Sequence, residues 1–482
     1  MQPSLVQFVV LATALTLPAH ADNPPPRDPF EGVWLGTVTA PDHRTEIGFA
    51  FTRGKQGLNA SFAMPGMFVT GMNLGPANIA DRTYALPDLG VKLTLADGRL
   101  TGTFANPLLR VELQRGDRFP AEPPAPVLPA GPAPVWSRAL GAETWATLVA
   151  RDGMVYVGSA DGRLHAIRAD DGSKAWTWSG PHPLYGEALV TQDSIYLVDE
   201  RTDLIALRRT DGSLQWRMPL HDEKLAGQPA PKNPTFNRRV AVPVLADGTL
   251  YVGSTDHGLY ALEAATGKIL WRHDVGAPVF AAVALAGDDL VAGCYDGSVV
   301  VLSRRSGAES ARTKLGGPVA SAPVIAGDLI IVGCRDYLLY GLRRADLGVA
   351  WRDSYWFSWV ESVPRLADGI LYIGGSDYRR VSAVDPATGR ALWATDVRGL
   401  TWGTPLVTAD TVYAGTSAQN PAAIHHEGGI TALDRHTGAV KWRHVVPLPE
   451  KAERAGYLGS LVLAGGKVIG AAFDGTLVAY PR

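Results

Sequence analysis

The side chains best suited to chemistry occupy equivalent positions in a sequence repeat. One position in each of eight repeat units carries Trp145, Tyr185, Val240, Phe280, Ala320, Glu361, Trp402 or Tyr457. Five of these residues are aromatic and one is an acid. Aromatic surroundings disfavour the ionised form of a carboxyl group, which raises its pKa and suits Glu361 to general acid or base catalysis. Aromatic clusters also mark interaction sites, so these residues could instead stack on a flat ligand or grip a chain segment.

Three further aromatic residues and one histidine could complete this set. Tyr355, Trp356 and Trp359 precede Glu361 and are expected to form a wall that overhangs it. His182 precedes one of the aromatic positions. A carboxylate and an imidazole within hydrogen-bond distance could support a hydrolase or lyase reaction without a cofactor. The sequence indicates no Ser-His-Asp or Cys-His catalytic set.

A histidine-containing insertion is the candidate for metal binding. His425, His426 and Glu427 are consecutive, and these residue types bind zinc in proteins. Adjacent histidines in a loop, however, lack the i, i+4 spacing of a zinc pair on a helix. A loop without metal is therefore the alternative interpretation.

The two cysteines, Cys294 and Cys334, occupy the same place in consecutive repeat units. An oxidising compartment would favour a disulfide between them, and this bond requires α-carbons within about 7 Å. Neighbouring units of the fold inferred below diverge outwards, so two buried free thiols are expected instead.

The repeat itself predicts how these residues are positioned. Each unit has a marker position nine residues after a Leu, Ile or Val that ends an apolar stretch. Six units carry tryptophan there, namely Trp176, Trp216, Trp271, Trp351, Trp393 and Trp442, and one carries Ala311. With Trp136 as an earlier member, the markers are separated by 40, 40, 55, 40, 40, 42 and 49 residues. Periods of this length are typical of solenoids and propellers.

Each unit is predicted to form four antiparallel strands. In VYVGSADGRLHAIRADDGSKAW, alternating apolar runs are separated by turns around Gly162 and Gly172, which is the pattern of antiparallel hairpins. A further short strand precedes each unit and ends in Ala-Asp-Gly or a related turn. Four strands in about forty residues make one blade of a β-propeller.

The ends of the array predict a closed ring of eight blades. The last unit stops at Tyr480 after three strands, while Trp136 begins the array as a lone fourth strand. The two termini can therefore complete one blade between them. Ala311 stands where an outer strand elsewhere carries a tryptophan, so it predicts a locally repacked or looser strand.

Loop lengths indicate which end of the ring binds. If the innermost strands run from the top face to the bottom face, the extra residues all lie in top loops, at 217–239, 353–360, 416–429 and 443–456. The aromatic positions and Glu361 then surround the top mouth of the central channel. Loops on a rigid scaffold commonly carry binding residues. Bulky side chains could also simply fill a wide channel, and Glu361 could pair with Arg239 or Arg454.

Three segments are predicted before the propeller. Residues 1–21 have the apolar stretch and the Pro-Ala-His-Ala end of a signal peptide, although no Lys or Arg precedes that stretch. Residues 30–115 contain short alternating strands and predict a small antiparallel barrel or sandwich. Residues 116–134 form a proline-rich linker. The propeller is expected over residues 135–482.

Composition indicates a periplasmic or secreted protein. The 482-residue chain has a formal net charge of −2 with scattered Lys and Arg, so it offers no basic stripe to nucleic acid. No segment after the leader approaches the ~18–20 apolar residues that span a bilayer, so no transmembrane anchor is expected in the mature chain. The usage of Gly, Ala, Pro and Arg suggests a bacterium. The leader has no lipobox cysteine, so a lipoprotein is not expected.

The repeat, clearest in ALEAATGKILW, resembles the pyrroloquinoline quinone (PQQ) repeat family over residues 136–480. This superfamily includes quinoprotein dehydrogenases and the BamB propeller of the outer-membrane protein assembly machine, so the resemblance implies a fold but not one activity. Quinoprotein dehydrogenases stack the quinone between a tryptophan and a disulfide of adjacent cysteines, and carboxylates hold calcium or a lanthanide. This chain has no adjacent cysteines, no matching carboxylate set and no Cys-x-x-Cys-His motif.

A second resemblance concerns the small β domain. Its opening Gly-x-Trp-x-Gly at residues 32–36 and its closing Leu-Thr-Gly-Thr-Phe are similar to a domain that precedes some secreted serine hydrolases. No catalytic set accompanies these motifs. We therefore expect this domain to add a second contact rather than an activity.

Three functions from different classes follow. The first is a non-catalytic periplasmic binding or assembly module that holds an envelope protein, a peptide or a glycan. Its binding surface, called the funnel below, comprises Trp145, Tyr185, Phe280, Glu361, Trp402, Tyr457, Tyr355, Trp356 and Trp359. The second is an oxidoreductase with PQQ or another planar cofactor in the funnel. The third is a cofactor-free hydrolase or lyase at Glu361 and His182. Whether the protein is an enzyme stays open at this stage.

Overall fold

The computed structural model describes residues 28–39, 44–55, 57–65, 69–87, 90–104, 106–119, 128–221, 241–355, 358–376, 378–419 and 426–482. These residues form two compact units, one before Leu128 and one comprising Leu128–Gln419 and His426–Arg482. Strands dominate both units. Within the described ranges, no helix has the length and apolar character needed to cross a membrane.

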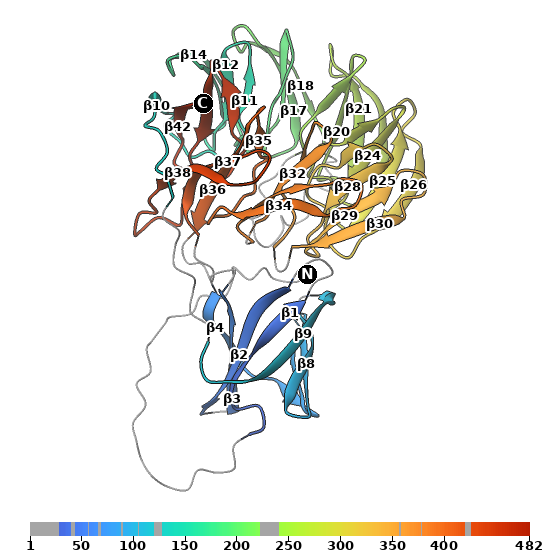
Figure 1. Cartoon of the computed structure of the whole chain (residues 1–482). Coiled ribbons are helices and arrows are strands. Elements are labelled where there is room, and N and C mark those ends of the chain that lie inside the picture. Colours follow the sequence, from blue (N-terminus) through green and yellow to red (C-terminus); the bar gives the residue numbers. More distant parts are fainter. Residues whose placement is uncertain are drawn as a thin grey trace. The chain divides into compact units, whose positions relative to one another are not determined.

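The first unit is a single nine-stranded antiparallel sheet (Figure 1). Its strands are β1 (Gly32–Thr39), β2 (Arg44–Gly54), β3 (Gly57–Met64), β4 (Val69–Pro76), β5 (Ile79–Ala80), β6 (Thr83–Leu86), β7 (Val91–Ala96), β8 (Arg99–Phe104) and β9 (Asn106–Gly116). Their order in the sheet is β4-β3-β2-β1-β9-β8-β7-β6-β5. Phe51 of β2 and Tyr84 of β6 pack with ring centroids 5.0 Å apart, although four strands separate them in the sheet. The sheet must therefore curl around an aromatic core.

The second unit is an eight-bladed antiparallel β-propeller, which confirms the predicted fold class. Blades 1 to 4 contain, from the inner to the outer strand, β11 (Val149–Arg151), β12 (Met154–Gly158), β13 (Arg163–Arg168), β14 (Lys174–Ser179); β15 (Leu189–Val190), β16 (Ser194–Val198), β17 (Asp203–Arg208), β18 (Leu214–Pro219); β19 (Val244–Ala246), β20 (Thr249–Gly253), β21 (Gly258–Glu263), β22 (Ile269–Asp274); and β23 (Ala284–Ala286), β24 (Asp289–Gly293), β25 (Ser298–Ser303), β26 (Glu309–Lys314).

Blades 5 to 8 complete the ring. They contain β27 (Val324–Ala326), β28 (Leu329–Gly333), β29 (Leu338–Arg343), β30 (Val349–Ser354); β31 (Arg365–Ala367), β32 (Ile370–Gly374), β33 (Arg380–Val384), β34 (Ala391–Asp396); β35 (Leu406–Val407), β36 (Thr411–Gln419), β37 (Gly428–Asp434), β38 (Val440–Val446); and β40 (Val462–Ala464), β41 (Lys467–Ala471), β42 (Thr476–Pro481), β10 (Trp136–Ala139). An additional strand, β39 (Arg454–Gly456), pairs with β36.

The eighth blade combines strands from both ends of the propeller sequence (Figure 1). Strand β10 pairs antiparallel with β42, so that Trp136 lies opposite Ala479 and Ala139 opposite Thr476. This arrangement confirms the predicted closure of the ring by an N-terminal outer strand.

The repeated tryptophans join each blade to the next. In six of them the indole N–H donates to a backbone carbonyl of the following blade at 2.9–3.2 Å: Trp136, Trp176, Trp216, Trp271, Trp351 and Trp393. The indole also covers a turn glycine of that blade. A Cβ atom on Gly267, for example, would lie 2.6 Å from Cε3 of Trp216, and Gly267 has a φ of 73°. Both the space and the left-handed backbone therefore favour glycine at this turn.

The interface without this tryptophan has changed on both sides. Ala311 replaces the tryptophan of β26, and Leu347 of blade 5 replaces the turn glycine four residues before Trp351. Leu347 keeps the left-handed backbone, with a φ of 57°, and is only 2% exposed. We infer that its side chain fills the space taken elsewhere by the indole. The burial of Leu347 favours a repacked interface, one of the two outcomes predicted from Ala311.

Replacing Ala311 by tryptophan and Leu347 by glycine should create here the tryptophan–glycine contact that joins other blades. Ala311→Trp alone is expected to clash with Leu347 and to lower the free energy of unfolding by about 1–3 kcal/mol. Ala311→Trp with Leu347→Gly should recover that loss, because glycine leaves space for the indole ring and adopts the left-handed backbone conformation without strain. Thermal unfolding of both single variants and the double variant would measure their coupling, about 0.5–3 kcal/mol for residues in contact. Strictly additive effects would contradict the proposed packing.

Candidate binding site in the propeller channel

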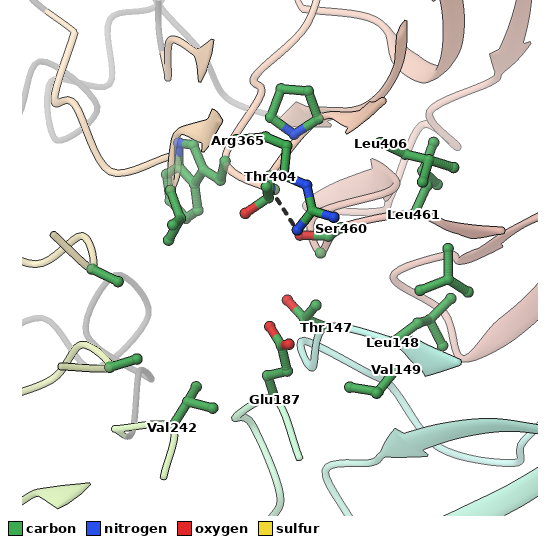
Figure 2. A pocket seen from close by; sticks show the side chains of 18 of the residues that line it. Thr147, Leu148, Val149, Glu187, Val242, Arg365, Thr404, Leu406, Ser460 and Leu461 are labelled. Carbon is green, nitrogen blue, oxygen red and sulfur yellow. Dashed lines mark hydrogen bonds between the residues drawn. The ribbon is translucent and has the colours of Figure 1, made fainter. Parts of the chain in front are cut away.

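A cavity of about 600 Å³ lies in the central channel of the propeller. Residues from the inner strand of each of the eight blades, or from the segment just before it, line its wall. Most of these residues are apolar or small, and Figure 2 shows Val149, Leu406 and Leu461 among them. A cavity of this size is typical of sites that bind small ligands.

Four of the predicted aromatic residues lie together on the cavity wall: Trp145, Tyr185, Phe280 and Trp402. The indole N–H of Trp402 donates a hydrogen bond to Oγ of Ser376, which fixes the orientation of the ring. The alignment of the inner strands thus identified side chains that do share one surface. Val240, from the same alignment, lies outside the described residues.

Two other funnel residues are buried between blades, which corrects their predicted place in the funnel. Tyr457 packs between blades 7 and 8, with its hydroxyl 3.2 Å from that of Tyr480. Tyr355 belongs to the core between blades 5 and 6 and is not an overhanging wall. Burial raises the pKa of both Tyr457 and Tyr355. Trp356 lies outside the described residues.

Glu361 is a buried partner of an ion pair rather than an isolated acid among aromatic rings. Its side chain is 1% exposed, and its Oε1 accepts a hydrogen bond from Nε of Arg335, which is 7% exposed. Arg335 was not among the partners expected from the sequence. Of those, Arg239 lies outside the described residues, and Arg454 packs over Trp145. Because Glu361 does not line the cavity, its position does not support catalysis there.

Arg335 is the centre of a cluster of aromatic side chains, called the Arg335 cluster below. Its guanidinium carbon lies 4.3 Å from the ring centroid of Trp359, and its Nη1 donates to the hydroxyl of Tyr295 at 2.8 Å. The Tyr295 ring in turn packs edge-to-face against Phe280, with centroids 5.0 Å apart. The cluster therefore reaches the cavity wall through Phe280.

A second cluster surrounds Arg454 and is called the Arg454 cluster. The guanidinium carbon lies 4.7 Å from the ring centroid of Trp145, 5.8 Å from that of Phe473 and 6.0 Å from that of Trp402. Trp145 and Phe473 also contact each other, with centroids 4.6 Å apart. These distances allow cation–π attraction. The first cluster draws on blades 4 to 6 and the second on blades 7, 8 and 1, so they approach the channel from different parts of the ring.

His182 and Glu361 do not form the expected acid–base pair. His182 precedes β15 in blade 2, whereas Glu361 precedes β31 in blade 6, on the far side of an eight-bladed ring. Among the described contacts, no hydrogen bond joins the imidazole to the carboxylate. These two residues therefore do not form the acid–base pair that a cofactor-free hydrolase or lyase would need at this place.

The carboxylate of Glu427 forms ion pairs with two arginines. Its Oε1 accepts a hydrogen bond from Nε of Arg398 at 2.8 Å, and its Oε2 lies 2.7 Å from Nη1 of Arg443. His426 is buried beside it in sequence, and His425 lies outside the described residues. In the part of the chain that the structure covers, no group of three or more His, Cys, Asp or Glu side chains could hold a metal ion. Because His425 lies outside that part, the metal site at His425, His426 and Glu427 stays a prediction.

The described residues do not fit the quinone site that the PQQ-repeat resemblance implies. Cys294 and Cys334 are free and buried in separate blades, so they form no vicinal disulfide. Burial raises the pKa of the Cys294 thiol to about 12 and also raises that of Cys334. Among the residues lining the channel, no cluster of carboxylates resembles a calcium site.

A Ser-Asp-His contact that the sequence analysis missed lies in the top turn of blade 1. Oγ of Ser159 donates to Oδ1 of Asp161 at 2.6 Å and lies 3.1 Å from Nε2 of His165. In a catalytic triad the histidine stands between the serine and the acid, whereas here the serine stands between the other two. Ser159 is fully buried. The contact therefore stabilises the turn, and burial lowers the pKa of His165.

The charged residues of the channel were also missed. Glu187 and Arg365 are the charged side chains among the described residues that line the cavity. Each lies two to four residues beyond one of the aligned aromatic or acidic positions. The same alignment, read further along each inner strand, contains the signal. Two residues after the aligned position, Glu187 is the one charged residue among the eight blades.

Sequence comparison identifies one family. The profile of the family described as outer membrane protein assembly factor BamB matches residues 130–228, 225–310, 260–358 and 295–482. Outer membrane protein assembly factor BamB of Yersinia pestis is 26% identical over 154 residues, which are 30% of this chain. The aligned region covers only 36% of that relative's length.

Structure comparison finds the same propeller fold in solved structures. The computationally designed protein Ika8 superposes with a TM-score of 0.56 and 17% identity, covering 71% of this chain and 98% of Ika8. Quinohemoprotein alcohol dehydrogenase from Comamonas testosteroni gives a TM-score of 0.55 and 13% identity, covering 72% of this chain and 76% of the enzyme. Identities this low show a common fold and do not transfer an activity.

Proposed function

The chain belongs to the family of the outer membrane protein assembly factor BamB, and from this premise we propose that it is a non-catalytic assembly module that holds a protein partner of the bacterial envelope at the mouth of its channel. Its Yersinia pestis relative is named as an assembly factor. An assembly factor works through contacts with other proteins. The observation that carries the proposal is the pair of arginine–aromatic clusters around the channel.

The composition of these clusters is that of a protein-binding surface. Tyr, Trp, Phe and Arg are enriched in the cores of protein interfaces, whereas Lys, Glu and Asp are depleted there. The Arg454 cluster combines Trp145, Trp402 and Phe473 with one arginine. The Arg335 cluster combines Trp359 and Tyr295 with another. Trp, Tyr and Arg are also the residue types that contribute most binding energy per side chain.

The rings of the clusters indicate the chemistry of the partner. The Arg335 cluster presents Trp359 and Tyr295, and the Arg454 cluster presents Trp145, Trp402 and Phe473. A partner segment rich in apolar and aromatic side chains would cover these rings. We place this interaction in the periplasm, to which residues 1–21, outside the described residues, would direct the chain.

Site-specific photo-crosslinking in the source bacterium would test the proposal. A photoreactive residue in place of Phe473 is expected to capture an envelope protein, whereas the same residue in place of Leu270, on the outer strand β22, should not. Binding of the captured protein should then be measured with purified components. Trp145→Ala with Arg454→Ala is expected to weaken it by about 30-fold or more, since hot-spot residues contribute about 2 kcal/mol or more.

The outcomes separate a funnel interface from other modes of binding. Thermal unfolding of the double variant should stay cooperative, because both side chains lie at the channel mouth rather than between blades. Trp271→Ala, which changes an outer indole, should bind the partner as the wild-type protein does. Equal capture from Leu270 and Phe473, or full affinity in the double variant, would show that the clusters are not the binding surface.

A further inference from the structure

Deeper in the channel, two opposite charges face the cavity without touching each other (Figure 2). We infer that the channel binds a small zwitterion, an amino acid or a short peptide, whose carboxylate pairs with Arg365 and whose ammonium group pairs with Glu187. This inference goes beyond the proposed function, because it concerns a small ligand inside the ring and not a protein at its mouth. It requires neither the Arg335 cluster nor the Arg454 cluster.

The propeller places the two side chains on opposite walls. Glu187 lies just before β15 in blade 2, and Arg365 begins β31 in blade 6. In a ring of eight blades, blades 2 and 6 face each other across the axis. At the position of Glu187 the other blades carry Thr147, Val242, Ala282, Ala322, Val363, Thr404 and Gly459, all of which line the cavity. One acid in such a ring is a specific feature of this channel.

Neither charged side chain has a partner among the described residues. The two groups interact electrostatically, but no hydrogen bond or ion pair joins the side chain of Glu187 or of Arg365 to another described residue. Both residues are exposed, so their charged ends are accessible to a ligand that enters the channel. A purely structural pair would be in direct contact, as Arg335 and Glu361 are. The gap between Glu187 and Arg365 is instead part of the cavity.

The remaining wall fits the body of such a ligand. Leu148, Val149, Leu406 and Leu461 present apolar surface, and Figure 2 shows them on one side of the cavity. Oγ of Ser460 already accepts a hydrogen bond from the backbone N–H of Thr404 at 2.8 Å. An amino acid or peptide with an aliphatic side chain would therefore place that side chain on the leucines. Pockets of about 300–1,000 Å³ accommodate ligands of this size.

The ionisation of Glu187 makes the inference testable through pH. The enclosing protein raises the pKa of this carboxyl to about 7, and the charge of Arg365 opposes the increase. Arg365 is the other charged group on the described cavity wall, and it stays protonated throughout the range considered. An ammonium ligand requires the ionised carboxylate. Affinity should therefore be highest above about pH 7 and fall as the pH decreases through that value.

Calorimetric titration of the purified full chain with leucine and with the dipeptide Leu-Leu would test the site. At least one of them is expected to bind, and the tighter one identifies the ligand as amino acid or peptide. 4-Methylpentanoic acid and 3-methylbutylamine, which lack the ammonium and the carboxylate respectively, should bind at least about tenfold more weakly. Glu187→Gln and Arg365→Met should each cause a loss of similar size, while Arg365→Lys should retain part of the affinity.

The controls decide between a ligand site and a structural charge pair. Asp410→Asn, an exposed change at the opposite end of a blade, should leave binding intact. Glu187→Gln should also abolish the difference in leucine affinity between pH 6 and pH 8. Absence of binding by both zwitterions at about 1 mM, or unchanged binding by Glu187→Gln and Arg365→Met, would overturn the inference. Partner capture is tested with Trp145 and Arg454, so either proposal can fail alone.

Discussion

A variant lacking residues 134–138 is expected to unfold at a markedly lower temperature than the intact protein and to self-associate. Strand β10 supplies the outer strand of blade 8, and the indole of Trp136 donates to the carbonyl of Ala169 in blade 1 at 3.0 Å. Without these residues β42 becomes an exposed edge strand, which can pair with other chains. Blades 8 and 1 also lose a connection. Differential scanning calorimetry and light scattering would measure both effects.

Two substitutions separate closure of the ring from loss of one indole. Trp136→Ala and Trp271→Ala each remove a ring that contacts the next blade, and each should cost about 3–5 kcal/mol. The deletion should cost more than Trp136→Ala, because it also removes the backbone pairing with β42. Equal unfolding temperatures for the deletion and Trp136→Ala would show that β10 contributes only a side chain. A deletion variant as stable as the wild-type protein would show that the ring does not depend on closure.

The propeller could be predicted because its signals are local and repeated. Each blade repeats the same strand lengths, the same turns and, with one exception, the same tryptophan. The exception shows the limit of such signals. Ala311 indicated that something differs in its blade, but the compensating Leu347 lies in the next blade, at a turn that carries glycine in the other units. A pair of changes across an interface becomes visible only when the blades are placed side by side.

The residues that line the channel were predicted less completely because equivalent positions need not point the same way. Trp145, Phe280 and Trp402 line the channel as the alignment predicts. Glu361 and Tyr457 come from the same alignment but are buried outside the cavity wall. Each follows a long top insertion, at 353–360 and 443–456, and the second of these contains the additional strand β39. An insertion changes the path of the chain into the inner strand, and this change leaves no trace in the repeat pattern.

The charged pair in the channel has no distinctive local signal in the sequence. Glu187 and Arg365 are unremarkable in sequence, since each is one of many charged residues near a turn. The two side chains face each other because they belong to blades 2 and 6, which are opposite in a ring of eight blades. The propeller thus contains two kinds of charged residue. Some form ion pairs in contact, such as Arg335 with Glu361, and others, such as Glu187 and Arg365, face the cavity.

Breaking the contact between Arg335 and Glu361 is expected to have the second large effect on stability. Glu361→Leu would leave the Arg335 guanidinium buried without its carboxylate, which should lower the free energy of unfolding by about 3–5 kcal/mol. Arg335→Met with Glu361→Leu should recover most of this loss, because replacing both charges by apolar side chains also removes the cost of their desolvation. Chemical denaturation of both single variants and the double variant would measure the effect.

An exposed pair of the same residue types provides the control for this cycle. Arg99 and Glu112, in the curled sheet, are in contact at 2.6 Å with side chains 58% and 60% exposed. Glu112→Leu should cost no more than about 1 kcal/mol, because water replaces the lost partner. The difference between the two glutamate variants then measures burial rather than residue type. Equal losses at the two sites, or a double variant as unstable as Glu361→Leu, would mean that Glu361 stabilises the propeller by packing and not by neutralising Arg335.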